Sequence, residues 1–256
     1  MKGNSVSTPV DVEVSLLPWP GDRVRLGMIA LSTDHSSECE IWAMAPQTEV
    51  EIFVSRIANE NPTTVANLRA MAPRLKEAAQ LILPGSPVGA MLYSCTSGSI
   101  VIGADEVASR INEAKPETKC TMPTVAAMAA FKALCVSKVA VLTPYLDEVN
   151  GPVFEYLTLN GISVVQFKSF RMASDVDMAM IPPSVVKSAA IEANVEEAEA
   201  IFISCTALRT SSIIHSLEKS LGKPVITSNQ AMLWHGLRLA GYRTPISGFG
   251  VLLSDH

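Results

Sequence analysis

The stretch Ala90–Ser99 (AMLYSCTSGS) decides the fold. It is an apolar run that ends at a cysteine, and hydroxyl and glycine residues follow at once. A short apolar run bounded by turn formers is typical of a buried parallel strand. The Thr-Ser-Gly-Ser that follows favours a turn and a helix cap. We therefore expect Cys95 at the carboxyl end of a strand, facing a helix amino terminus, where open α/β sheets bind ligands.

This position leaves two interpretations of Cys95. The free backbone N–H groups and the dipole of a helix amino terminus favour anions and lower the pKa of a thiol, which would make the cysteine reactive. A buried structural cysteine is the alternative, because free cysteines are commonly buried. The stretch by itself does not decide between the two.

A second copy of the pattern favours the reactive interpretation. Ala200–Thr210 (AIFISCTALRT) again has an apolar run, then Ser-Cys-Thr, and then an expected helix start. Two matching thiols at strand ends indicate an internally duplicated fold. In that fold, one half supplies Cys95 and the other supplies Cys205.

The rest of the chain alternates strands with helices, which predicts an α/β fold. We expect two pseudosymmetric domains, each a roughly four-stranded parallel sheet flanked by helices, with the active site in the cleft between them. The predicted boundaries are an extended N-terminal arm over 1–21, a first domain over 22–135 plus about 244–256, and a second domain over 136–243. The segment 246–253 is expected as a last strand that returns to the first domain.

Composition and charge narrow the class of protein. The chain has 256 residues, 48% of them hydrophobic, and a net charge of −5 without a basic block, which argues against nucleic acid as a partner. The five cysteines show neither disulfide-like spacing nor a Cys-x-x-Cys pair, so we expect no zinc cluster. No signal peptide and no membrane-spanning apolar stretch is visible, and we expect a cytoplasmic protein that does not bind membranes.

Several short motifs resemble one known group of enzymes. They are Gly27–Ala30 (GMIA), Cys95–Ser99 (CTSGS), Thr143–Tyr145 (TPY), Ser204–Thr206 (SCT) and Thr227–Gln230 (TSNQ) with Trp234. Together they resemble the aspartate/glutamate racemase superfamily, and within it the branch of maleate cis-trans isomerase and arylmalonate decarboxylase. The first loop, Ala30–Asp34, and the CTSGS motif look most like the ectoine-utilization protein A group.

The resemblance implies a cofactor-independent isomerase or racemase of a small carboxylate, without a metal, and a homo-oligomer. It also implies a role in ectoine or hydroxyectoine catabolism. Cys95 and Cys205 would be the catalytic pair across the cleft. The alternatives are a maleate cis-trans isomerase proper, an arylmalonate-type decarboxylase that uses Cys205 alone, and a non-catalytic ligand-binding relative. By the same resemblance, the substrate would be bound by Ser32, Asp34, Thr96, Ser97, Tyr145 and Thr206.

Asp34 departs from the pattern of the family. The maleate isomerases usually place Asn at this loop position, where it holds a substrate carboxylate. An ionised Asp34 would repel that carboxylate, which favours a substrate with an amine or another N–H donor at this end. The alternative is that Asp34 caps the following helix and does not meet the substrate.

Overall fold

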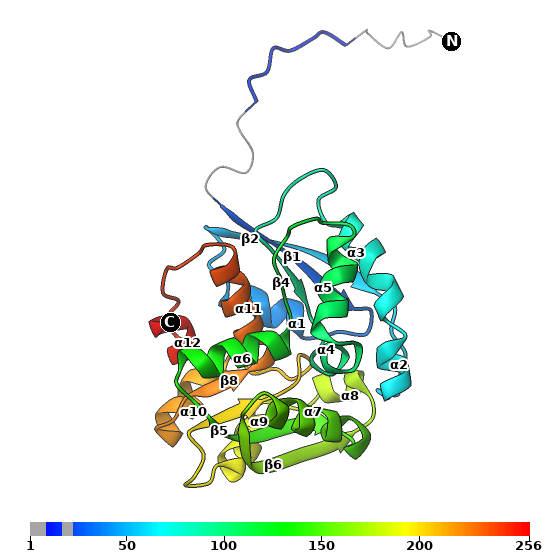
Figure 1. Ribbon diagram of the computed structural model, residues 1–256. Coiled ribbons are helices and arrows are strands. Elements are labelled where there is room, and N and C mark those ends of the chain that lie inside the picture. Colours follow the sequence, from blue (N-terminus) through cyan, green and yellow to red (C-terminus); the bar gives the residue numbers. More distant parts are fainter. Residues whose placement is uncertain (1–8, 17–22) are drawn as a thin grey trace, which may run out of the picture.

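The predicted pair of four-stranded parallel sheets is confirmed. The computed structural model describes residues 9–16 and 23–256, and within that part the strands form two separate sheets (Figure 1). The strands are β1 (Val24–Leu31), β2 (Val50–Ile57), β3 (Ala90–Tyr93), β4 (Cys120–Thr121), β5 (Lys138–Tyr145), β6 (Ser163–Met172), β7 (Ala200–Ile203) and β8 (Val225–Thr227).

The two sheets have the same topology, as an internal duplication requires. Their strand orders are β2-β1-β3-β4 and β6-β5-β7-β8, with every neighbouring pair parallel. The strands that lead to the two cysteines, β3 and β7, occupy equivalent inner positions and are buried throughout. Buried on both faces, they are continuously apolar rather than alternating, as the sequence predicts.

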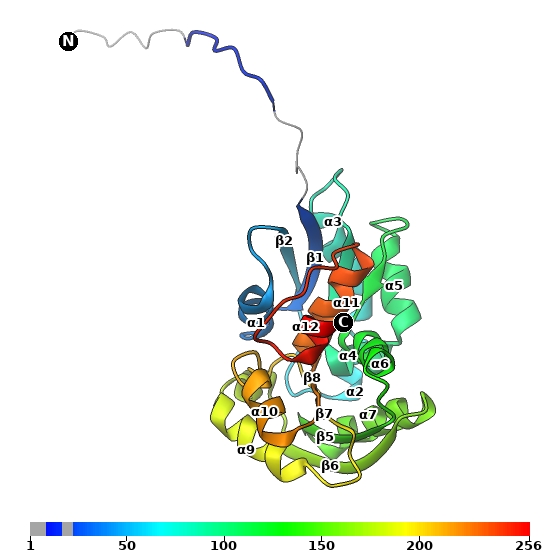
Figure 2. The same ribbon diagram turned by 90° about the vertical axis from the view of Figure 1, so that its left-hand side faces the viewer.

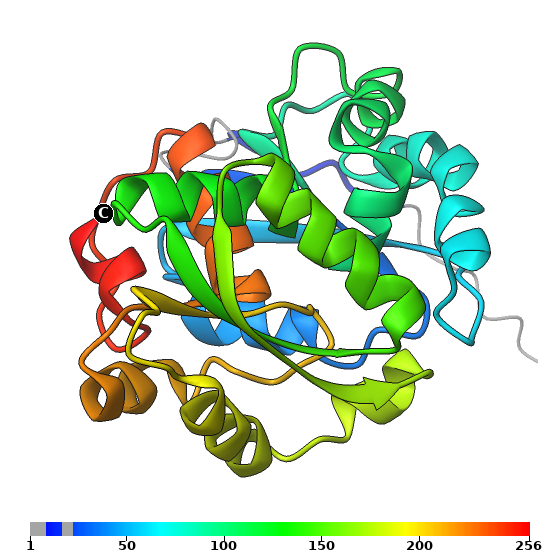
Figure 3. The same cartoon turned by 60° about the horizontal axis from the view of Figure 1, so that its bottom comes forward.

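Helices join the strands. The first half contains α1 (Ser37–Met44), α2 (Val65–Arg69), α3 (Leu75–Leu81), α4 (Thr96–Ile102), α5 (Ala104–Asn112) and α6 (Pro123–Ala133), and a short 3₁₀ helix η1 (Ala72–Arg74) around Pro73. The second half contains α7 (Asp147–Leu159), α8 (Asp175–Ala179), α9 (Pro183–Ala193), α10 (Ile214–Leu221), α11 (Ser228–Leu239) and α12 (Val251–Asp255). Figure 3 shows β5 and β6 running between α7 and α9, so this sheet is covered on both faces.

Two helices tie the halves together, because each packs on the sheet of the other half. Helix α11 lies against β3, where a Cβ on Gly236 would come within 2.9 Å of Leu92 Cδ1, so the glycine lets the helix approach without a shift of the Leu92 side chain. Helix α6 reaches the second sheet, where Phe131 meets Phe202 of β7 edge to face at 5.4 Å between ring centroids. The halves are therefore joined by a shared core as well as by a chain crossing.

The last strand expected from the sequence, over 246–253, is wrong. The segment is a loop followed by α12, and Gly248 and Gly250 adopt φ values of 93° and 87°, which an extended strand does not contain. The Ile246 N–H donates to Leu253 O at 2.8 Å, which closes the segment on itself. The apolar side chains that suggested a strand are buried by α12, which packs beside α11.

The N-terminal arm is described only over residues 9–16. These residues have no helix or strand and are exposed, and they lie away from both sheets (Figure 2). The remaining parts of the predicted arm, 1–8 and 17–21, lie outside the described residues. None of the described helices is long and apolar enough to span a membrane.

Candidate active site

Both cysteines line one cavity between the two halves. The cavity lies at the carboxyl ends of β1, β3, β5 and β7, where parallel sheets bind ligands. Of the residues predicted to form the site, seven line it: Asp34, Cys95, Thr96, Ser97, Tyr145, Cys205 and Thr206. Ser32, the eighth, does not.

Cys95 sits at the junction predicted from its sequence. It is the N-cap residue of α4, has an extended backbone, and its Sγ accepts a hydrogen bond from the Gly98 N–H at 3.2 Å. A Cβ on Gly98 would lie 2.8 Å from this sulfur and 2.6 Å from the Tyr93 hydroxyl oxygen. The glycine of the CTSGS motif therefore leaves room for the thiol as well as forming the first turn of the helix.

Cys205 occupies the equivalent strand end, but no helix begins beside it. The segment after β7 runs through turns, and α10 begins only at Ile214, so the helix start predicted directly after Cys205 is wrong. The Cys205 Sγ still accepts a hydrogen bond, from the Ala207 N–H at 3.3 Å. The two thiols are thus related by the fold, although their local turns differ.

A buried carboxylate in the first half holds the segment that follows Cys205. Glu40 Oε2, on α1, accepts hydrogen bonds from the backbone N–H groups of Thr210 and Ser211 at 2.7 and 2.6 Å and from the Thr210 hydroxyl at 3.2 Å. The Ser211 hydroxyl donates to Oε1 at 2.8 Å. Because Glu40 takes these N–H groups, the segment is fixed against α1.

Burial dominates the acidity of both thiols. It raises the pKa of Cys95 to about 11, against the lowering effect of hydrogen bonds from the Gly98 N–H and from Ser97 and Tyr93. It raises the pKa of Cys205 to about 12, against hydrogen bonds from Tyr145 and the Ala207 N–H. The sequence predicts that a helix amino terminus lowers the pKa of the thiol. This prediction is wrong, because desolvation outweighs the hydrogen-bond donors and the net pKa of each thiol is raised. At neutral pH the protonated thiol is therefore the dominant form of both groups, and the thiolate is the minor form.

Tyr145 lines the same cavity as the two thiols. Its buried side chain, at the end of β5, forms hydrogen bonds with Cys205 and Ser97, and the burial raises the pKa of its hydroxyl well above 10. The hydroxyl therefore stays protonated and is a donor within the cavity. The substrate-binding role that the resemblance implied for Tyr145 stays a prediction.

The two threonines that follow the cysteines link the halves of the chain. The Thr96 hydroxyl donates to Ser228 Oγ at 2.9 Å, at the start of α11. The Thr206 hydroxyl donates to Ser94 O at 3.4 Å, and Asn229 Nδ2 donates to Thr206 O at 2.9 Å. Both threonines line the cavity, so they brace its walls while bordering the ligand space.

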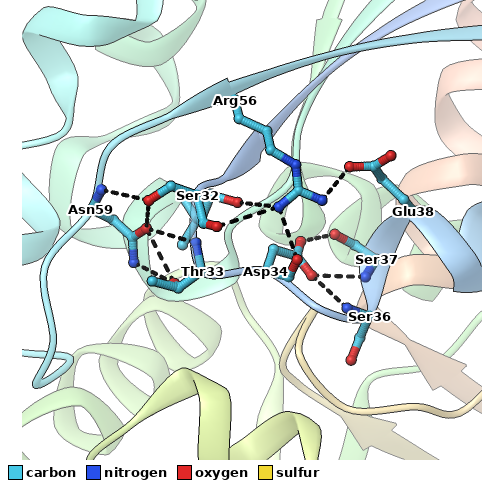
Figure 4. Close-up of polar contacts among 9 residues, drawn as sticks. Ser32, Thr33, Asp34, Ser36, Ser37, Glu38, Arg56 and Asn59 are labelled. Carbon is cyan, nitrogen blue, oxygen red and sulfur yellow. Dashed lines mark hydrogen bonds and ion pairs between the residues drawn. The ribbon is translucent and has the colours of Figure 1, made fainter.

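Asp34 makes the capping contact of the second sequence interpretation, and it also lines the cavity. Its Oδ1 accepts hydrogen bonds from the Ser36 and Ser37 N–H groups at 2.8 and 2.9 Å, and its Oδ2 contacts the Ser37 hydroxyl (Figure 4). Burial raises the pKa of this carboxyl, and the two backbone donors act in the opposite direction. Arg56 binds the backbone oxygens of the same loop, at 3.0 Å for Leu31 O and 2.9 Å for Asp34 O.

Ser32 points to a neighbouring loop. Its hydroxyl donates to Asn59 Oδ1 at 2.9 Å (Figure 4), and Ser32 itself does not line the cavity. Asn59 itself lines the cavity, together with Thr33 and Asp175, and none of these three was singled out from the sequence. Thr33 and Asn59 come from loops without periodic patterning, and Asp175 is the first residue of the short helix α8.

Comparison with known proteins shows the family to which this chain belongs. The family model described as arylmalonate decarboxylase matches residues 74–253, which include both cysteine motifs. The chain belongs to the arylmalonate decarboxylase family. A family member from Bordetella bronchiseptica, arylmalonate decarboxylase, is 29% identical over 124 residues, which are 48% of this chain and 52% of that protein.

Maleate isomerases are similar over a longer part of the chain. The maleate isomerase of Nocardia farcinica is 24% identical over 240 residues, 90% of this chain and 95% of that protein. A solved structure of the maleate cis-trans isomerase from Nocardia farcinica, a Cys-to-Ser mutant with a covalently bound succinylcysteine intermediate, superposes with a TM-score of 0.83 at 21% identity. That match covers 91% of this chain and 99% of the other. The likeness establishes the shared fold of two parallel sheets.

Proposed function

We propose that the protein is a cofactor-independent isomerase or racemase of a small carboxylate, with Cys95 and Cys205 as its two reacting groups. The observation that carries this proposal is that both thiols, one from each half, line the same cavity. The relatives are isomerases and decarboxylases, and one isomerase structure holds a succinyl group on a cysteine. A pair of thiols suits reactions that need a group on each side of a carbon atom.

Cys95 is the better candidate for the base or nucleophile. Its sulfur is approached by the Gly98 N–H and by the hydroxyls of Ser97 and Tyr93, and all three favour the thiolate. In a racemisation, the Cys95 thiolate takes the proton from the carbon beside the carboxylate, and the Cys205 thiol delivers its proton to the opposite face. In a cis-trans isomerisation, the Cys95 thiolate adds to one carbon of the double bond and the Cys205 thiol gives its proton to the other carbon. After rotation about the resulting single bond, the Cys205 thiolate takes a proton back from that carbon, the double bond forms again and the Cys95 thiolate leaves.

The charge that develops on the substrate carboxylate requires donors. The side chains of Thr96, Ser97, Tyr145 and Thr206 border the cavity with hydroxyl groups. The Thr96 and Thr206 hydroxyls already donate to Ser228 Oγ and Ser94 O, so they reach the substrate only by exchanging these bonds. Tyr145 stays protonated because the pKa of its hydroxyl is raised. Donors fixed in place before the reaction stabilise such an anion more than mobile water does.

A decarboxylase that uses Cys205 alone is the second candidate. It is favoured by the matching family model. In that reaction, loss of carbon dioxide leaves an enediolate, and the Cys205 thiol, with a pKa of about 12, supplies the proton. The presence of Cys95 in the same cavity favours the two-thiol reaction instead.

Three finer parts of the proposal rest on the family resemblance and on the sequence. We propose a nitrogen-containing substrate of the kind met in ectoine or hydroxyectoine catabolism. We also propose that the protein is a homo-oligomer and that it acts in the cytoplasm. Sedimentation of the full chain tests the oligomer, and the substrate panel described next tests the substrate.

The proposal is tested by following a panel of carboxylates by proton NMR in deuterium oxide. The panel holds maleate, both enantiomers of aspartate, hydantoins, aryl malonates, and ectoine with its hydrolysis products. We expect isomerisation or deuterium exchange of at least one compound by the wild type and none by the double variant Cys95→Ala/Cys205→Ala. Cys39→Ala is the control, because Cys39 is exposed and does not line the cavity. Equal turnover by the wild type and the double variant would refute the proposal.

A further inference from the structure

The charges around the cavity are unusual for a site that takes a carboxylate. Asp34, Glu60 and Asp175 line it, whereas none of its described lining residues is Lys, Arg or His. A substrate with two carboxylates would meet acidic side chains and no cation. Like charges at short range in a partly buried site are unfavourable, so the wall favours a ligand that carries positive charge as well.

The three acidic side chains differ in whether they are free to bind a ligand. Both oxygens of Asp34 are engaged in capping α1, and Glu60 is exposed. Asp175 has one oxygen with donors from the protein and one without. Its Oδ2 accepts hydrogen bonds from the Thr33 hydroxyl and from Asn59 Nδ2, the latter at 3.3 Å, whereas its Oδ1 is buried and has no partner among the described residues.

A buried carboxylate oxygen without a donor is costly, because it has lost water and gained nothing. The two bonds to Oδ2 come from the first half of the chain, and Asp175 itself lies on α8 of the second half. These bonds fix the carboxylate at the border between the halves. A donor on the ligand would satisfy the remaining oxygen at little entropic cost, since the side chain is already held.

We propose that Asp175 binds an ammonium or other cationic N–H group of the substrate, so that the substrate is a small zwitterionic amino carboxylate. This inference rests on the proposed function and deepens it: the hydroxyl-lined part of the cavity takes the carboxylate, and Asp175 Oδ1 takes the nitrogen. Asp175 thus takes the place of Asp34, whose oxygens bond the start of α1, as the group that recognises the substrate nitrogen.

The same contact links substrate binding to the chemistry. The charge of Asp175 contributes to raising the pKa of Cys95, because a nearby anion disfavours the thiolate. A cation bound at Asp175 opposes this effect. Binding of the correct substrate therefore eases ionisation of Cys95, and a ligand without the cation does not.

The test compares ligands that differ only by an ammonium group. The probes are aspartate (both enantiomers) against succinate, and 4-aminobutyrate against butyrate, with dissociation constants measured by calorimetry on the full chain. The variants are Asp175→Asn, which keeps the shape of the side chain, and Asp177→Asn as the control. Asp177 is on the same helix, carries the same charge, is exposed and does not line the cavity.

We expect the wild type and Asp177→Asn to bind at least one ammonium-bearing probe about 10-fold or more tightly than its partner. Asp175→Asn should lose that preference by about 10- to 100-fold while binding succinate or butyrate as well as before or better. A merely structural role would weaken all probes equally and lower the melting temperature. Either that result, or a wild type without any ammonium preference, would overturn the inference.

Failure of this inference is distinguishable from failure of the proposed function. The probe affinities do not depend on turnover, and the cysteine variants do not remove Asp175. If the double cysteine variant loses turnover but Asp175→Asn keeps the ammonium preference, the two-thiol function stands and the assignment of Asp175 falls. If the cysteine variant keeps turnover but Asp175→Asn loses the preference, the reverse holds.

Discussion

Replacing Glu40 tests whether the position of Cys205 depends on a carboxylate in the other half of the chain. Glu40 accepts four hydrogen bonds from Thr210 and Ser211, two of them from backbone N–H groups. Glu40→Gln keeps the size of the side chain and removes its charge. Glu40→Ala removes all four bonds and leaves both backbone groups buried without a partner.

The size of the effect follows from these contacts. A hydrogen bond to a charged acceptor contributes about 1 kcal/mol more than one to a neutral acceptor, which is about 4 kcal/mol over four bonds. An amide is cheaper to bury than a carboxylate, so we expect a net loss of about 2 kcal/mol in the free energy of unfolding for Glu40→Gln. For Glu40→Ala we expect about 4 kcal/mol, because each unpaired backbone N–H costs about 1–3 kcal/mol.

Two measurements check this prediction. Urea unfolding gives the free energies, and the alkylation rate of Cys205 reports whether the segment after β7 has moved. Glu38→Gln is the matched control on the same helix, since the Glu38 side chain is 31% exposed and pairs with Arg56, and we expect a loss below about 1 kcal/mol. The reasoning is refuted if Glu40→Gln is as mild as Glu38→Gln, or if Glu40→Ala leaves the reactivity of Cys205 unchanged.

Three further predictions concern the thiols and their neighbours. Gly98→Ala should lower turnover at least about 10-fold, because its Cβ would lie 2.8 Å from Cys95 Sγ. The control is Gly151→Ala in α7, where the added Cβ meets no atom within 4 Å. It should leave turnover unchanged and add up to about 1 kcal/mol to the free energy of unfolding. Activity assays and urea unfolding measure both effects, and equal turnover by the two variants would contradict the prediction. Tyr145→Phe should raise the pKa of Cys205 further and slow turnover about 10- to 1000-fold, since it removes a donor to the thiol. Thiolate absorbance against pH measures the first effect and kcat the second. An unchanged kcat would contradict the prediction. Finally, the folded pKa values of about 11 for Cys95 and about 12 for Cys205 lie above the unfolded value of 9.0, so the stability that the buried protonated thiols contribute is present below pH 9 and is lost as pH rises through the folded values. Urea unfolding from pH 8 to 11 should therefore show a steeper fall in the free energy of unfolding for the wild type than for Cys95→Ala/Cys205→Ala. Equal slopes would contradict the burial argument.

The parts of the fold that the sequence predicts correctly are those with a strong local signal. The apolar runs before Cys95 and Cys205 are buried strands because each run is apolar throughout and is followed by a turn former. The seven cavity residues near these strand ends and loops follow from the same topology and from the family resemblance. The local sequence pattern is sufficient to predict the position of a side chain that lies on a strand or at its end.

The errors arise where a distant residue decides a local structure. The turn after Cys205 is held by Glu40, which lies about 170 positions earlier in the chain, and no pattern in the turn itself indicates this. Asp175 and Asn59 meet only because the two halves face one another, so the contact has no sequence spacing that could reveal it. The thiol pKa values depend on burial by both halves, which outweighs the local donors.

The central claim is that two thiols act on one substrate, and the most direct test removes them one at a time. With the best substrate from the panel, incorporation of deuterium from solvent would be followed by mass spectrometry for the wild type, Cys95→Ala and Cys205→Ala. The account predicts that isomerisation or racemisation is lost in both single variants. Turnover that persists in Cys95→Ala, with loss only in Cys205→Ala, would contradict it and assign the protein to one-thiol protonation after decarboxylation.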